Sequence, residues 1–144
     1  MGEKKIVLTD RTIFPHWQTE NLRFGDTDQL GHVNNAVYAT FSESGRVNLL
    51  LENGKIMVPS GLDTVIARLE LDFRVELHWP GKVEIGTTVL GLGRSSYRLG
   101  QGMFSGDKCV ATAVNVIVLI DLATRRSTPL PDSFRAYLSK FAPR

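Results

Sequence analysis

The chain has 144 residues, of which 42% are hydrophobic and 22% charged, and its formal net charge is +2. A chain of this size and composition can bury a hydrophobic core without disulfides or metals, so we expect a single domain over residues 1–144 with its core at about 17–141. The small positive charge forms no basic tract, which argues against nucleic-acid binding. The lone Cys109, the lack of a signal-like N-terminal stretch and the short apolar runs predict a cytoplasmic protein with no membrane partner.

The N-terminal third predicts one extended segment followed by one helix. Residues 1–16 carry mixed charges and indicate a loosely tied lead-in, and Trp17 begins the extended segment. A helix is expected over about 35–52, with Asn34 or Asn35 as its N-cap and Gly54 as its C-terminal stop. The helix prediction depends on apolar or small residues that recur every four positions, which are Val37, Phe41, Gly45 and Leu49.

The rest of the chain predicts four strands and a short terminal helix. Residues 65–79 alternate between apolar odd and polar even positions, with Ile66 the only apolar residue on the polar side. Glycines at positions 100 and 102 permit sharp curvature or a close approach of another backbone. The fourth strand carries valines on one face, including Val114, Val116 and Val118. The remaining expected elements are strands at 83–92, 95–104 and 109–120, a hairpin turn at 105–108 and a helix at 132–141.

These elements predict an α+β fold in which a curved antiparallel sheet of about five strands wraps around one long central helix. Such a single layer leaves an edge strand unpaired, and pairing with a second copy would satisfy its backbone groups. We therefore expect a homodimer.

Unusual chemistry is concentrated in residues 23–38, which hold two carboxylates, a histidine, two asparagines and two glycines. Hydrolysis of an ester or thioester needs an activated water or nucleophile, and a donor for the oxygen that becomes negative. A helix N-terminus supplies free N–H groups. The bend at Gly31 could bring Asp28, as base or nucleophile, opposite the backbone N–H of Asn35.

Other interpretations of this segment stay open. Asp26 and Asp28 could simply cap a turn, and together with His32 they could bind a divalent ion, although the other two histidines are expected to lie elsewhere. The sequence contains no Gly-x-Ser-x-Gly motif, which a serine hydrolase of the α/β type would need. Cys109 is expected to be a buried thiol. We predict no metal and no cofactor.

The motif Asp28-x-x-Gly31-His32-Val33-Asn34-Asn35-x-x-Tyr38 resembles the signature of the hotdog-fold thioesterases, in particular the 4-hydroxybenzoyl-CoA thioesterase-like group with its acyl-CoA and acyl-carrier-protein branches. The resemblance covers about residues 17–141. It implies an acyl-CoA thioesterase without a cofactor, dimers whose active sites lie between subunits, and often tetramers built from those dimers. An acyl-carrier protein is the alternative substrate.

The resemblance also implies roles for individual residues. Asp28 would be the catalytic carboxylate, and Asn35 would donate its backbone N–H to the thioester carbonyl. We count His32 with the catalytic residues. His32 and Asn34 match the His-Val-Asn-Asn form of the motif in the acyl-carrier-protein and long-chain branches, which favours fatty acyl groups as substrates. The expected substrate contacts are Asn34, Tyr38 and Phe41 along the acyl slot, and Arg94, Ser95, Ser96 and Arg98 against the CoA nucleotide. For Arg94 and Arg98 a merely solvent-exposed role is an equal alternative.

Two further classes stay open at this stage. One is a hotdog hydratase or dehydratase, whose acid and histidine would be arranged differently on the helix. The other is a non-catalytic module that binds acyl-CoA.

Overall fold

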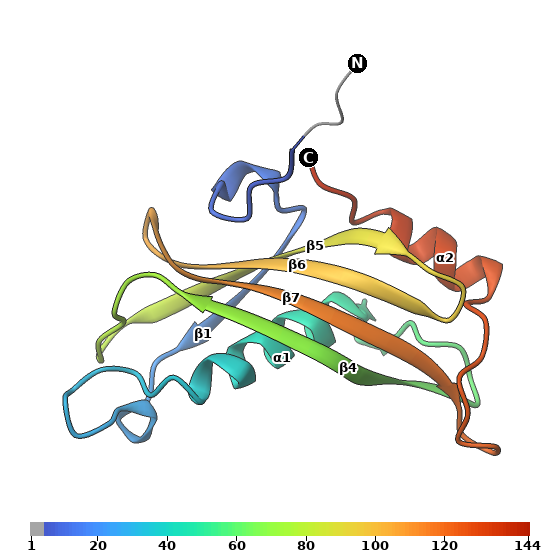
Figure 1. Cartoon of the computed structure of the whole chain (residues 1–144), viewed down its shortest axis with the longest axis horizontal. Coiled ribbons are helices and arrows are strands. Elements are labelled where there is room, and N and C mark those ends of the chain that lie inside the picture. Colours follow the sequence, from blue (N-terminus) through green and yellow to red (C-terminus); the bar gives the residue numbers. More distant parts are fainter. Residues whose placement is uncertain (1–4) are drawn as a thin grey trace.

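A computed structural model describes residues 5–144 as one antiparallel sheet that curves around a helix. Figure 1 shows the strands arching over α1 (Val37–Leu49), with α2 (Asp132–Ser139) at one end of the sheet. The strands follow the order β1 (His16–Asn21), β5 (Lys82–Leu92), β6 (Ser96–Ser105), β7 (Lys108–Asp121) and β4 (Leu62–Phe73). Short 3-10 turns are η1 (Arg11–Ile13) and η2 (Phe24–Asp26). This is the predicted architecture, and β1 and β4 form its two edges.

Most predicted boundaries agree with the structure to within a few residues. The helix is shorter than predicted, because it starts at Val37 and ends at Leu49. Gly54 is not a helix stop. It lies with Asn53 in the turn between β2 (Leu51–Glu52) and β3 (Lys55–Ile56), where both residues have positive φ angles of 77° and 51°, respectively. Within residues 5–144, no helix combines the length and apolar character needed to cross a membrane.

One face of α1 is buried against the sheet. It includes Phe41, Gly45 and Leu49 of the predicted stripe, whereas the fourth predicted position, Val37, is half-buried and its neighbour Tyr38 is buried. Gly45 is the point of closest approach. A Cβ atom there would lie 2.7 Å from Cγ2 of Ile85 and 2.9 Å from Nε2 of Gln101. The helix can therefore approach β5 and β6 only because position 45 has no side chain.

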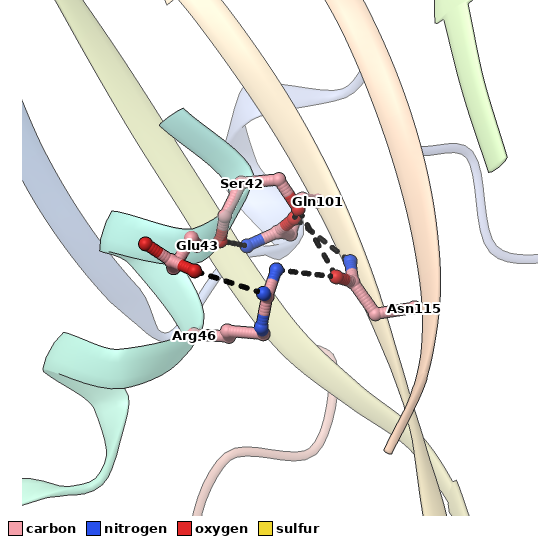
Figure 2. Close-up of polar contacts among 5 residues, drawn as sticks. All are labelled: Ser42, Glu43, Arg46, Gln101 and Asn115. Carbon is pink, nitrogen blue, oxygen red and sulfur yellow. Dashed lines mark hydrogen bonds and ion pairs between the residues drawn. The ribbon is translucent and has the colours of Figure 1, made fainter. Parts of the chain in front are cut away.

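A polar network joins the middle of α1 to the central strands (Figure 2). The Ser42 hydroxyl donates to Oε1 of Gln101 at 2.5 Å, and Gln101 returns its Nε2–H to the Ser42 carbonyl at 3.0 Å. Asn115 donates to the same Gln101 oxygen at 2.9 Å and accepts from Arg46 at 3.2 Å. Glu43 lies 3.6 Å from the Arg46 guanidinium. Because Ser42, Gln101 and Asn115 are fully buried, these bonds satisfy groups that would otherwise be costly to bury.

The alternation predicted for the strand at 65–79 is interrupted in β4. A bulge between Ile66 and Arg68 shifts the register with β7, so the inward face changes parity there. After the bulge the odd-numbered Leu69 and Leu71 pack on the core, as predicted. Before the bulge the even-numbered Leu62 packs on the core instead. The strand ends at Phe73, and the segment 74–79 leaves the sheet. Ile66, the apolar exception in the sequence pattern, marks this change of face.

The valine face of β7 points away from α1. From Ala111 onward, the residues that pack in the core around the helix are odd-numbered, among them Ala113, Ile117 and Leu119, whereas Val110 at the start of the strand also packs in this core. Val114, Val116 and Val118 are half-buried on the opposite face. Both faces of this central strand are therefore largely apolar, and alternation alone could not indicate which of them meets the helix.

The lead-in at residues 1–16 is not loosely tied over most of its length. Residues 1–4 lie outside the described part, but Ile13 and Phe14 are only 7% and 1% exposed. Leu8 and Phe14 pack on the outer face of the sheet, where a Cβ at Gly86 would lie 2.6 Å from the Phe14 ring and one at Gly102 would lie 2.6 Å from the Leu8 carbonyl oxygen. The glycine at position 102 thus permits the close backbone approach that the sequence indicated.

Candidate active site

Asp26 is built into the turn that precedes the site. Its carboxylate, 2% exposed, accepts from the backbone N–H of Arg23 at 2.8 Å and from the Arg23 guanidinium at 2.9 Å. Burial raises the pKa of Asp26, but the bonds and charge of Arg23 outweigh burial and leave it below the ordinary value of 3.8. The capping alternative weighed for this residue is therefore what the structure shows.

Asp28 lies on the next turn with its carboxylate partly engaged. Oδ1 accepts from the backbone N–H of Leu30 at 2.9 Å and of His32 at 3.3 Å. Gly31, at a φ of +82°, lets the chain reverse, and the Asp28 N–H returns to the His32 carbonyl at 2.8 Å. Oδ2 makes no hydrogen bond to any residue in the range 5–144. The turn thus fixes the carboxylate and leaves one oxygen open to solvent.

The entry to α1 leaves a backbone donor free beside this turn. The Asn34 side chain accepts from the Ala36 N–H at 3.0 Å, and the Asn34 carbonyl accepts from the Val37 N–H at 2.9 Å. Asn34 thus caps the turn that leads into α1, whereas the residue directly before the helix is Ala36, which makes no side-chain cap bond. The N–H of Asn35 has no acceptor within the described part of the chain. It is exposed next to the positive end of the helix dipole.

These groups meet at one pocket of about 450 Å³. Tyr38 forms its inner wall, where its ring packs edge-on against Phe73 at 5.1 Å between centroids. Burial, and to a smaller extent the charge of Glu76, raise the pKa of the Tyr38 hydroxyl, which therefore stays neutral. The lining residues are Asp28, His32, Val33, Asn35, Tyr38 and the five residues from Phe73 to Leu77. Four of the predicted site residues thus share one opening.

Other predicted contact residues lie elsewhere in the chain. Phe41 is 4% exposed in the core and lines a separate hollow beside β1. Arg94, Ser95, Ser96 and Arg98 lie where β6 begins. Ser96 pairs with Val118 of β7, whereas Phe73 at the pocket pairs with Ala111. Seven residues of β7 separate those levels, which is roughly 23 Å at the usual rise of a strand. Within one chain, the basic segment therefore lies at the far end of the sheet from the pocket.

Glu76, which lines the pocket, and His78 beside it were not predicted as site residues from the sequence. Nε2 of His32 lies 3.2 Å from the Glu76 carboxylate, and Nε2 of His78 lies 3.5 Å from the same oxygen. The two imidazole rings pack edge-on at 5.1 Å, and a backbone bridge joins residues 32 and 78. The expectation that the other histidines lie apart from His32 is thus wrong for His78. No pattern in the sequence signals this contact, because it depends on how segment 74–79 leaves the sheet.

The arrangement fits acyl hydrolysis better than the other chemistries considered. A fixed carboxylate with a free oxygen and an unpaired N–H at a helix start face the same pocket, which is what addition to a carbonyl requires. Asp26 does not join Asp28 and His32 as a metal ligand, because its carboxylate is turned to Arg23.

Comparisons with known proteins agree on the family. The model of the thioesterase-like superfamily matches residues 22–138. A 1,4-dihydroxy-2-naphthoyl-CoA hydrolase of Synechococcus elongatus is 25% identical over 81% of this chain and 90% of its own length. Among solved structures, a Pseudomonas aeruginosa protein superposes with a TM-score of 0.83 at 25% identity, covering 92% of this chain and 95% of that one. A thioesterase from Thermus thermophilus, solved with coenzyme A and Zn, superposes at 0.74 with 30% identity, covering 89% and 94%.

The family match covers most of the chain, and the sheet wrapped around α1 is the architecture of the solved relatives. The chain therefore belongs to the thioesterase-like superfamily and is a thioester hydrolase of the hotdog fold.

Proposed function

We propose that the protein hydrolyses an acyl-CoA thioester to the free acid and CoA, with Asp28 as the catalytic carboxylate and Asn35 as the oxyanion donor. The observation that carries this proposal is that a carboxylate oxygen without a partner and a free helix-start N–H line the same pocket. The CoA thioester for which one relative is named and the coenzyme A bound to another support the choice of substrate class.

In the proposed reaction, the thioester carbonyl oxygen accepts a hydrogen bond from the Asn35 N–H. Oδ2 of Asp28 takes a proton from a water molecule, whose oxygen adds to the carbonyl carbon. The resulting oxyanion is stabilised by the same N–H and by the helix dipole. Collapse of the intermediate breaks the C–S bond, and the CoA sulfur leaves as a thiolate that is then protonated. His32, whose backbone N–H bonds to Asp28, positions the carboxylate.

A covalent course uses the same residues. Asp28 would attack the carbonyl carbon itself, the thiolate would leave, and water would then cleave the mixed anhydride. Hydrolysis in ¹⁸O-labelled water under single-turnover conditions separates the two courses, because only the anhydride route can first release product acid that carries an unlabelled oxygen from Asp28.

We also propose that the working unit is a dimer formed through β4. This edge strand and the segment after it expose Val65, Ile66, Phe73 and Val75, each between 40% and 53%. Antiparallel pairing of two β4 strands would set the start of one against the end of the other. The segment from Arg94 to Arg98 of the second copy would then approach the pocket that its own chain cannot reach, and could contact the CoA phosphates.

The pocket suits an aromatic acyl group as well as an aliphatic one. Two aromatic residues, Tyr38 and Phe73, line it, and the similar Synechococcus hydrolase is named for an aromatic acyl-CoA. The motif around His32 instead favours fatty acyl groups. A thiol-release assay across aromatic, short, branched and long acyl-CoAs decides between them, and acyl-carrier-protein and enoyl-CoA substrates test the remaining alternatives.

The proposal predicts that Asp28→Asn lowers kcat by about 10²- to 10⁴-fold, the usual contribution of a general base. The matched control is Asp107→Asn, which changes an exposed aspartate in the turn between β6 and β7. His32→Ala should reduce activity less, since its backbone bond to Asp28 persists. Near-normal turnover by Asp28→Asn would remove the assignment, and tight acyl-CoA binding without thiol release by the wild type would indicate a binding module instead.

A further inference from the structure

We infer that His32, Glu76 and His78 form a binding site for a divalent transition-metal ion of the zinc class. The ion would tie the turn that carries Asp28 to the segment that follows β4. This inference concerns metal binding and does not depend on the proposed reaction.

The three side chains form a preassembled ligand set. One oxygen of Glu76 lies 3.2 Å from Nε2 of His32 and 3.5 Å from Nε2 of His78, and all three ligand atoms lie within 4.8 Å of one another. Zinc binds imidazole nitrogen and carboxylate oxygen at about 2.0–2.2 Å, so neighbouring ligands on a tetrahedral ion are about 3.4 Å apart. The two observed separations fall on either side of that value. The side chains of Glu76 and His78 are more than half exposed, so they can rotate to close the remaining edge.

The orientation of His78 favours a cation in particular. Its Nδ1 lies 3.3 Å from the carbonyl oxygen of Gly31, and a carbonyl can only accept, so Nδ1 carries the proton. In the neutral ring Nε2 then presents a lone pair toward the Glu76 carboxylate, which is also only an acceptor. A proton on Nε2 would relieve this repulsion, and a metal ion held between the two atoms would do the same. The Gly31 carbonyl would also fix the ring orientation, as outer-shell partners of metal-bound histidines commonly do.

The location gives the site a structural consequence. His32 belongs to the turn that follows Asp28, whereas Glu76 and His78 belong to the segment after β4, and one backbone bridge and the Val33–Leu77 hydrogen bond join these two segments near the site. Two protein ligands on one side and one on the other would add a strong crosslink there. Three protein ligands leave a coordination position for water, and His32 and Glu76 face the pocket.

The ligand chemistry also predicts which ions are excluded. Mg²⁺ prefers six oxygen ligands in a near-octahedral arrangement, and two imidazoles with one carboxylate do not supply them. Zn²⁺ and Co²⁺ accept such a mixed nitrogen and oxygen set.

The test uses the full-length protein without an affinity tag, stripped with a chelator and then titrated with Zn²⁺, Co²⁺ or Mg²⁺ by calorimetry. We expect one Zn²⁺ per chain, a Co²⁺ absorption spectrum of the intensity typical of four-coordinate sites, and no Mg²⁺ binding. At Zn²⁺ of about 100 times Kd, the unfolding midpoint should rise by several degrees. His78→Ala and Glu76→Gln should each weaken Zn²⁺ binding by more than about 100-fold, beyond the roughly 10- to 100-fold that the loss of an outer-shell partner usually costs.

The control variant is Glu70→Gln, which changes a half-exposed carboxylate on β4 outside the cluster. It should bind Zn²⁺ like the wild type. The inference is overturned if the wild type does not bind Zn²⁺, if Mg²⁺ binds equally well, or if His78→Ala keeps the wild-type affinity while remaining folded by circular dichroism.

Discussion

At the residue scale, two aspartates only two positions apart have opposite surroundings. Asp26 is buried and bonded to Arg23, whereas Asp28 is exposed with one oxygen free. The first carboxylate is therefore placed to stabilise the turn, and the second is placed to meet a substrate. The sequence shows both aspartates, but it does not show that one is buried and the other exposed.

This difference predicts that Asp26→Asn affects stability where Asp28→Asn affects turnover. Removing the charge leaves the Arg23 bonds weaker and should lower the free energy of unfolding at pH 7 by about 1–3 kcal/mol. Because the folded pKa of Asp26 is lowered, its stabilisation is present above 3.8 and is lost as the pH falls below that value. Urea unfolding at pH 7 and pH 3 measures both effects.

In the wild type, the loss of stability between these two pH values should exceed that of Asp26→Asn. Asp28→Asn serves as the control, with unfolding like that of the wild type at pH 7. Equal acid sensitivity in the wild type and Asp26→Asn would contradict the role given to Arg23.

At the element scale, the contact between α1 and the sheet depends on Gly45. We predict that Gly45→Ala lowers the free energy of unfolding by about 1–3 kcal/mol, because its methyl group would overlap Ile85 and Gln101 and overpack the core. Thermal unfolding measures the change. The control is Gly25→Ala, where an added Cβ meets nothing within 4 Å. Equal stability of the two variants would show that the helix moves away at little cost.

The elements also show what the sequence could predict. Helix α1, the hairpin between β6 and β7 and the terminal helix follow from local periodicity and turn residues, so their positions agree closely with the structure. The bulge near Ile66 could not be placed, because it depends on pairing with β7. The proximity of His78 to His32 joins segments distant in the sequence, and no local pattern carries that information.

At the scale of the whole molecule, a single chain leaves the pocket and the edge of β4 open to solvent. We predict that Val65→Glu, which places a charge in the apolar edge that the proposed contact would bury, raises the dimer dissociation constant by about tenfold or more and lowers kcat with it. Only about 1.4 kcal/mol is needed for a tenfold change. Light scattering coupled to size exclusion, and thiol release at matched concentration, test this.

Ile56→Glu is the control, because Ile56 is 68% exposed but lies in the small β3 hairpin outside the sheet edge. Full activity of a Val65→Glu monomer would show that one chain suffices and that the basic segment at Arg94 has no part in the reaction.

The bonds among Ser42, Gln101 and Asn115 have a consequence for how this protein can change over evolution. These directional hydrogen bonds fix the rotation of α1 about its axis and its position along the sheet. A purely apolar contact would allow the helix to rotate or slide against the strands. Substitutions could then change the size of core side chains, at a cost in stability, while the N-terminus of α1 keeps its position relative to the pocket. New acyl specificities could arise by remodelling the pocket walls, with the carbonyl-binding geometry inherited unchanged.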